Sequence, residues 1–242
     1  MKKHLIALAA LTAFAGAASA QSSVTLFGVV DLSGRWLNND GAKQYQLSQG
    51  GLAASRLGFR GSEDLGGGMR AEFWLEGALD PDTGTVGVTS INGDRNNAAA
   101  LFTRRSTASL LGGWGEVRLG RDQTATYLNT PVFDPFGDNG LGAASHLTTK
   151  PPAVPVGGGY DTLARANNMV AYFLPSGIAG GLYGLVQAAT GENVYGNKFF
   201  GGRVGYAAGP FNAALAYGAA RRSTPTPTAT TSTSALRGAS AS

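Results

Sequence analysis

The chain has 242 residues, of which 43% are hydrophobic and 14% charged, with 37 glycines and no cysteine. This apolar content is too high for a disordered chain, the glycines follow no Gly-X-Y period, and the lack of cysteine excludes disulfide frameworks and thiolate chemistry. The net charge of +4 at first favours a nucleic-acid partner, but five of the 19 basic residues lie in residues 1–20 or 221–242. Between these ends the acidic residues slightly outnumber the basic ones, so we expect no nucleic-acid partner.

The first 20 residues have the pattern of a secretory signal peptide. Lys2 and Lys3 precede an apolar stretch, and the segment ends in the small residues Ala18, Ser19 and Ala20. Cleavage is expected after Ala20. A membrane anchor is the alternative, but the apolar stretch is shorter than the roughly 20 residues of a spanning helix. We therefore divide the chain into a signal peptide at 1–20, a folded part at 21–220 and a tail at 221–242.

Apolar and polar residues alternate along the folded part. From Val24 to Trp36 the even positions are apolar or glycine, whereas the odd positions include Asp31 and Arg35. A period of two indicates strands with one apolar and one polar face. Nine such segments, bounded by Gly, Asn, Asp or Pro, are predicted as strands at or near 24–36, 56–60, 69–76, 103–111, 116–121, 168–174, 181–188, 199–207 and 211–217.

The connections between these segments alternate in length. Short ones lie at 62–68, 112–115, 175–180 and 208–210, and long ones near 38–52, 79–100, 122–165 and 189–198. This alternation is typical of outer-membrane barrels, with short periplasmic turns and long extracellular loops. The alternative is a secreted soluble β-sandwich binding protein, which would also bury an apolar face. However, aromatic residues at the ends of the apolar faces favour a transmembrane antiparallel up-and-down β-barrel, and these are Trp36, Tyr172, Tyr206 and Tyr217.

Four segments carry a more specific signal, namely QSSVTLFGVVD at 21–31, SRLGFRGSEDLGGG at 55–68, GEVRLGR at 115–121 and NNMVAY at 167–172. In these segments the chain resembles the Gram-negative general diffusion porins, and the resemblance extends from the signal peptide to about Tyr217. It implies a sixteen-stranded barrel that forms a homotrimer in the lipid of the cell outer membrane. It also implies passive diffusion of small hydrophilic solutes and ions, with the third long loop folded into the pore.

The candidate pore-lining residues follow from the strand faces and from this resemblance. Alternation places an arginine set on the polar, lumenal face, because a charge facing lipid would be costly. These residues are Arg35, Arg56, Arg60, Arg70, Arg105 and Arg118. The resemblance makes the long loop at 122–165 the constriction loop, with Asp134 and Asp138 as its acidic members. The alternatives are an exposed loop with solvated aspartates, and arginines held in ion pairs away from the constriction.

Excess arginine in the lumen predicts a mild preference for anions, which pairing with Glu72 or Glu76 would weaken. No catalytic motif, metal site or cofactor site is recognised, so we expect a channel and not an enzyme. An outer-membrane barrel enzyme is the less favoured alternative.

The tail at 221–242 is rich in Thr, Ser and Pro, contains no aromatic residue and shows no alternation. Such a low-complexity tail is not expected to fold. Together with only nine strands of an expected sixteen, this predicts an incomplete barrel and a truncated or frame-shifted product, and a mucin-like stalk is the less favoured alternative. We therefore expect residues 21–242, expressed alone, not to form a stable trimeric channel, because open sheet edges are not tolerated in lipid.

Overall fold

The computed structural model describes residues 23–86, 88–89, 98–140, 142–144, 164–190 and 197–222. The predicted signal peptide and the tail beyond 222 lie outside these residues. The main strands are β1 (Ser23–Val29), β4 (Arg56–Gly66), β5 (Met69–Asp80), β9 (Arg105–Gly112), β10 (Gly115–Gln123), β11 (Arg165–Phe173), β12 (Leu182–Ala189), β13 (Asn197–Ala208) and β14 (Phe211–Arg222). Shorter elements are β2 (Leu32–Asn39), β3 (Ala42–Gln49), β6 (Thr85–Val86), β7 (Val88–Thr89), β8 (Ala98–Ala99), the helix α2 (Asn129–Phe133) and the 3-10 helix η1 (Ile178–Gly180).

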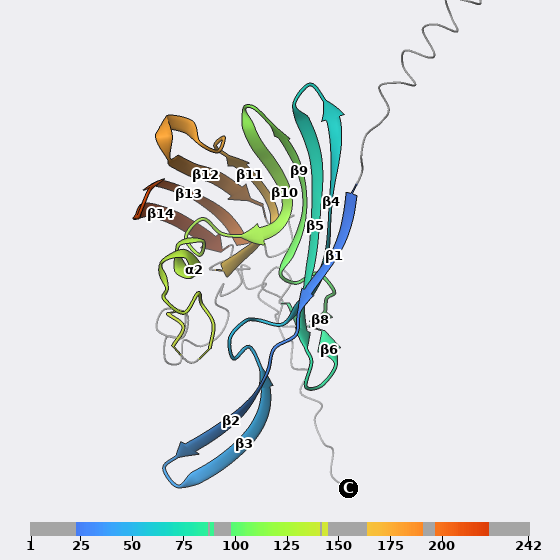
Figure 1. Cartoon of the computed structure of the whole chain (residues 1–242), viewed down its shortest axis with the longest axis vertical. Helices are drawn as coiled ribbons and strands as arrows, with labels where there is room; N and C mark the ends of the chain where they lie inside the picture. The colour runs from blue at the N-terminus through green and yellow to red at the C-terminus, as the bar shows by residue number, and fades with distance from the viewer. Residues whose placement is uncertain are drawn as a thin grey trace, which may run out of the picture.

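The main strands form one antiparallel sheet in the order β1-β4-β5-β9-β10-β11-β12-β13-β14, with β6 on β5. The sheet curves around a hollow, and the loop that carries α2 lies on the hollow side (Figure 1). β1 and β14 are the two ends of this path, so the sheet is not closed within the described residues. The predicted fold, an incomplete antiparallel barrel of nine main strands, is confirmed. Within the described residues, no helix is long and apolar enough to cross a membrane.

The register of the sheet aligns apolar residues across every strand. One continuous row of paired residues contains Val24, Gly61, Phe73, Ala108, Leu119, Val170, Ala188, Phe200 and Ala219. Large members of this row are solvent-exposed in the isolated chain, for example Phe200 at 61% and Val170 at 54%. An exposed apolar surface that crosses a whole sheet is the surface of a protein that faces lipid.

The buried core is small and lies on the opposite face. Its members are Ala166, Met169, Ala171, Ala189 and Phe199, with Phe173 packed against them. These residues belong to β11, β12 and β13, beneath the α2 loop. The core therefore packs under that loop and does not fill the whole hollow.

The prediction of one continuous strand at 24–36 is wrong, because the strand is interrupted at residues 30 and 31. Asp31 accepts hydrogen bonds from the backbone N–H groups of Gly51 (3.0 Å), Leu52 and Ala53 (both 2.8 Å). These bonds hold the pKa of the Asp31 carboxyl below its usual value, led by those from Leu52 and Ala53. Beyond this junction, β2 pairs only with β3, so part of the predicted 38–52 loop is a hairpin that projects from the large sheet (Figure 1).

The short connections use backbone conformations that suit glycine. Between β4 and β5, Gly66, Gly67 and Gly68 all have positive φ, at 79°, 61° and 78°, which residues with a Cβ rarely adopt. At the other end of the chain, β14 runs to Arg222, which pairs with Asn197, two residues beyond the expected boundary at 220.

Candidate functional site

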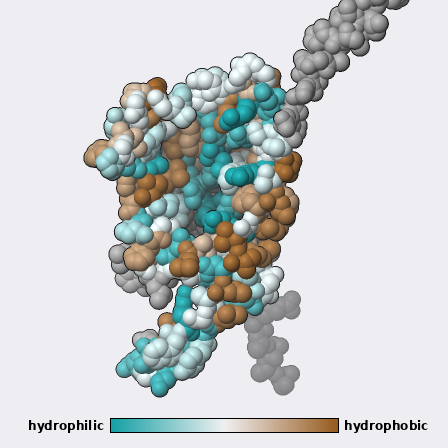
Figure 2. All heavy atoms as spheres, viewed as in Figure 1, coloured by the Kyte–Doolittle hydropathy of each residue, from teal (hydrophilic) through white to brown (hydrophobic). Residues whose placement is uncertain are grey.

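The hollow of the sheet is lined by hydrophilic residues, whereas apolar residues gather toward its margins (Figure 2). Five of the six predicted arginines lie on the strands that form this hollow, namely Arg56, Arg60, Arg70, Arg105 and Arg118. The sixth, Arg35, lies on β2 in the projecting hairpin, apart from the others. Its predicted pore-lining role stays a prediction.

Glu76 on β5 is the centre of the first charge cluster. Its carboxylate accepts hydrogen bonds from Arg104 Nε at 2.5 Å and from Trp74 Nε1 at 2.9 Å. Arg56 Nε lies 3.9 Å from the same carboxylate. The Glu76 side chain is only 11% exposed. Its two guanidinium partners therefore offset the cost of removing its negative charge from water.

A second charge cluster follows β10. Arg118 binds Glu116 through two hydrogen bonds of 2.7 and 2.9 Å, and it also donates to Asp122 at 2.6 Å. Asp122 in turn lies 3.5 Å from Arg105 on β9. Each carboxylate of this cluster is therefore bound by at least one arginine, and these bonds fix the orientation of the side chains on the inner face of the sheet.

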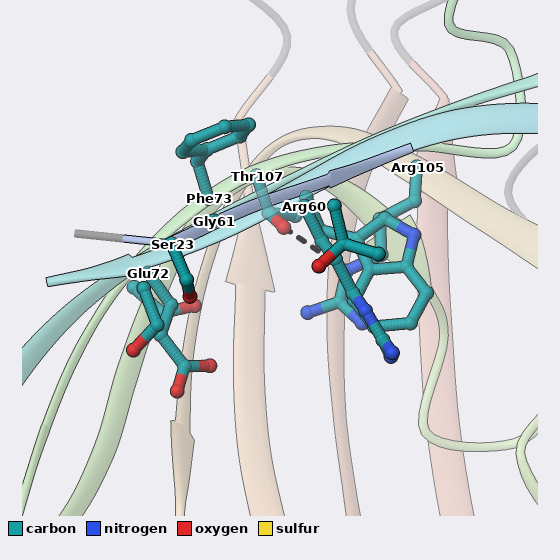
Figure 3. A pocket seen from close by; sticks show the side chains of 11 residues that line it. Ser23, Arg60, Gly61, Glu72, Phe73, Arg105 and Thr107 are labelled. Atoms are coloured by element: carbon teal, nitrogen blue, oxygen red, sulfur yellow. Dashed lines mark hydrogen bonds between the residues drawn. The ribbon is translucent and has the colours of Figure 1, made fainter. Parts of the chain in front are cut away.

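Arg60 on β4 lies against aromatic rings, and it forms no salt bridge within the part of the chain that the structure describes. Its guanidinium lies 5.5 Å from the Trp74 ring centre and 5.7 Å from that of Phe27, distances at which a cation is attracted to the ring face. Arg105 covers Trp74 at 4.6 Å. Arg60 lines an open cavity of about 330 Å³ with Thr25, Ser62, Glu72, Thr107 and Ser109, among others. Arg60 and Glu72 point into this space, whereas Phe73 points to the opposite face of the sheet (Figure 3).

Arg70, the second residue of β5, lies at the rim of the hollow. It pairs with Glu72 at 3.2 Å, but its side chain is 55% exposed. Because exposed ion pairs are weak, this pair leaves Arg70 available to water.

The long connection after β10 leaves and rejoins the sheet at one place, because Gln123 pairs with Arg165. Its described part crosses the inner face of the sheet. Asn129 at the start of α2 accepts a hydrogen bond from Arg203 on β13 at 2.7 Å. Further along, the Asn139 side chain accepts a hydrogen bond from the N–H of Ala54 at 3.1 Å. The loop therefore bridges the wall at β13 and the segment that precedes β4.

The two predicted loop aspartates have different surroundings. Asp134 accepts hydrogen bonds from the N–H groups of Ala144 (2.8 Å), Phe136 (2.9 Å) and Asp138 (3.0 Å). These bonds, led by that of Ala144, lower the pKa of the Asp134 carboxyl, and they organise the turn that follows α2. Asp138 accepts the hydroxyl hydrogen bond of Tyr127.

Burial, together with this contact, raises the pKa of Tyr127 to about 12. Its phenol is therefore protonated at neutral pH and acts as a donor. The constriction role of Asp134 and Asp138 stays a prediction.

Three arginines near the site were not singled out from the sequence. They are Arg104, which binds Glu76, Arg165, which lies over the Tyr127 ring at 5.9 Å, and Arg203. Arg203 lies on the strand face opposite Phe200 and Val204, so alternation along β13 could have identified it. Alternation along the predicted strand at 103–111 puts Arg104 on the face opposite Arg105, but in the structure Arg104 precedes β9. Arg165 is the first residue of β11, where alternation is no guide. Among the described residues, no group of three or more His, Cys, Asp or Glu could hold a metal ion.

Comparisons with known proteins agree with this geometry. Residues 7–242 match the family model described as Gram-negative porin. The chain is 42% identical over 223 residues to outer membrane porin protein 32 of Delftia acidovorans, covering 89% of this chain and 59% of that protein. It is 32% identical over 252 residues to an outer membrane porin protein of Bordetella pertussis, covering 90% of this chain and 59% of that protein.

Among solved structures, the chain is similar to the anion-selective porin from Comamonas acidovorans, with 37% sequence identity and a TM-score of 0.68. This match covers 82% of the chain and 57% of that structure. The chain thus spans somewhat more than half the length of the relatives it matches. These matches overturn the soluble β-sandwich alternative and confirm the predicted outer-membrane location. With this fold, this arginine-rich inner face and these relatives, the chain belongs to the Gram-negative porin family.

Proposed function

We propose that the protein forms part of a water-filled channel through which small hydrophilic solutes and ions diffuse passively, with a mild preference for anions. The observation that carries this proposal is the charge balance of the inner face. Glu72, Glu76, Glu116 and Asp122 each pair with at least one arginine.

Three inner arginines remain without a salt bridge to any described residue, and these are Arg60, Arg165 and Arg203. Excess fixed charge of one sign on a pore wall attracts ions of the other sign. Because these four wall carboxylates are paired with arginines, the three guanidiniums without a salt bridge add positive potential along the wall. The selectivity in the name of the Comamonas porin supports the same sign.

The test is the reversal potential of the protein, purified from outer membranes, in a planar bilayer with a KCl gradient. We expect a potential whose sign reports chloride as the more permeant ion, and a smaller potential at high ionic strength because salt screens the arginines. A cation-selective or unselective channel at low salt would refute the proposal.

We further propose that the assembled protein is a homotrimer in outer-membrane lipid. The apolar row that crosses all nine main strands supports the lipid contact, and the porin family resemblance supports the trimer. Electrophoresis of unheated and boiled samples tests the assembly. For the protein assembled in outer membranes we expect a band of three subunits that boiling converts to monomer, whereas residues 21–242 expressed alone are expected to run as monomer under both conditions. A monomer under both conditions from outer membranes would contradict the trimer.

A further inference from the structure

We propose that Gln187 on β12 is a positioning residue that holds the α2 loop against the wall and thereby sets the width of the channel. This inference rests on the proposed channel function and on the expectation, from the porin resemblance, that the long loop folds into the pore. It names the residue of the sheet that positions the loop.

The neck of the loop, where residues 123 and 124 lie beside residues 164 and 165, cannot by itself fix the direction in which the loop points. Gln123 pairs with Arg165, and the N–H of Thr124 donates to the carbonyl of Ala164 at 3.1 Å. These contacts hold the two ends of the loop side by side. A loop with adjacent ends can rotate about them as a unit, so its orientation requires contacts beyond the neck.

Gln187 supplies such a contact immediately after the neck. Its side-chain oxygen accepts the N–H of Ala125, and its Nε2 donates to the carbonyl of Gln123 at 3.2 Å. Nε2 also lies 3.2 Å from the sulfur of Met169. Gln187 is only 2% exposed, so both ends of its amide find their partners within the protein, as a buried amide requires.

The wall around Gln187 is shaped to receive the loop. The residues in register with Gln187 on the neighbouring strands are Ala171, Gly201 and, beyond it, Gly218. A Cβ at Gly218 would lie 3.1 Å from the methyl carbon of Thr126. The lack of a side chain at Gly218 therefore leaves room for the Thr126 side chain of the loop and for the Phe199 ring, which a Cβ there would meet at 2.9 Å. Gln187 is the one long polar side chain among these four.

The other tethers lie further along the loop. Arg203 holds Asn129, and Asn139 reaches Ala54 on the far side. A displacement at the neck is magnified toward the tip, since the loop extends from it. Gln187 is the tether nearest the neck among the described residues, and it sets the position from which the rest of the loop starts.

The decisive variant is Q187L, which keeps a similar volume but leaves the fully buried N–H of Ala125 without its acceptor. Q187E keeps an acceptor for Ala125 and removes the donor to Gln123. Q46L makes the same chemical change on β3, in the projecting hairpin, and serves as the matched control. All are prepared as the protein assembled in outer membranes, and the readouts are hydrogen exchange of residues 124–130 and entry of uncharged sugars into proteoliposomes.

For Q187L we expect exchange at 124–130 to accelerate by about tenfold, the effect of one lost hydrogen bond, and large uncharged sugars to enter several-fold faster. Q187E is expected to lie between Q187L and the wild type, and Q46L to match the wild type. Wild-type exchange at 124–130 in Q187L would overturn the inference, as would faster exchange with unchanged sugar entry.

If Q187L also exposes β11 and β12 to exchange, Q187E decides the question. Faster loop exchange with an intact wall supports positioning, and wild-type exchange refutes it. Uncharged sugars report pore width and not charge. The inference can therefore fail while the reversal potential still shows anion preference, and the proposed selectivity can fail while the sugars still report a displaced loop.

Discussion

Replacement of Arg60 by glutamine tests which arginines create the anion preference. Arg60 is held over Trp74 and Phe27 and has no salt bridge to a described carboxylate. Among the described residues, no carboxylate lies within ion-pair distance of its positive charge, which faces the cavity. Glutamine removes the charge without creating a new one, and it leaves the carboxylate–arginine clusters of the wall in place.

The size of the effect follows from Coulomb's law. An ion that passes about 5 Å from the guanidinium interacts with it by about 0.8 kcal/mol in water, and screening at 0.15 M salt reduces this to about 0.4 kcal/mol. The substitution removes an attraction for the anion and an equal repulsion for the cation. The anion-to-cation permeability ratio is therefore expected to fall about fourfold at 0.15 M salt and by a larger factor in dilute salt.

The assay is the reversal potential in planar bilayers at two salt concentrations. R60K, which keeps the charge, is expected to retain most of the preference. K43Q removes one positive charge from the exposed hairpin strand β3 and is expected to leave the potential unchanged. If R60Q and wild type gave the same permeability ratio in dilute salt, the assignment of selectivity to unpaired arginines would be wrong.

Three further predictions concern stability and local structure. E76Q is expected to lower the free energy of unfolding by about 3 kcal/mol in urea titrations, because it leaves the Arg104 guanidinium without its buried partner, and a loss below about 1 kcal/mol would contradict this. The hydrogen bonds that lower the Asp31 pKa stabilise the hairpin junction above about pH 4, the usual carboxyl pKa, and this contribution is lost as pH falls through the lowered value. NMR titration of the amide at Leu52 should show this transition in wild type but not in D31N. G120A is expected to destabilise the sheet by more than about 2 kcal/mol, because Gly120 has a φ of 121° and its Cβ would lie 2.1 Å from a backbone oxygen, whereas G113A, which has open space, should unfold like the wild type.

The strands and their faces could be predicted because they depend on local information. Alternation with a period of two assigns each side chain to one face, whatever the distant chain does. It placed Arg60 and Arg118 on the inner face and Phe73 on the outer one, as the structure shows. Turn residues such as Gly66 marked the ends of strands for the same local reason.

The state of each inner charge could not be predicted in this way. Arg118 and Arg60 carry the same pattern in the sequence, yet Arg118 is bound to Glu116 and Asp122, whereas Arg60 rests on aromatic rings. Alternation specifies a face, but ion pairing depends on register between strands that are far apart in the chain. The division of the arginines into paired and unpaired sets therefore needed the folded sheet.

The sequence by itself determined that this protein is an antiparallel barrel wall with an apolar outer face and an arginine-rich inner face. Only the tertiary structure decided where the first strand breaks and how the long loop is held. The loop contact of Gln187 with Ala125 spans 62 residues, and that of Asn139 with Ala54 spans 85. Such contacts leave no periodic signal, because each joins single side chains to a backbone group brought near only when the sheet curves.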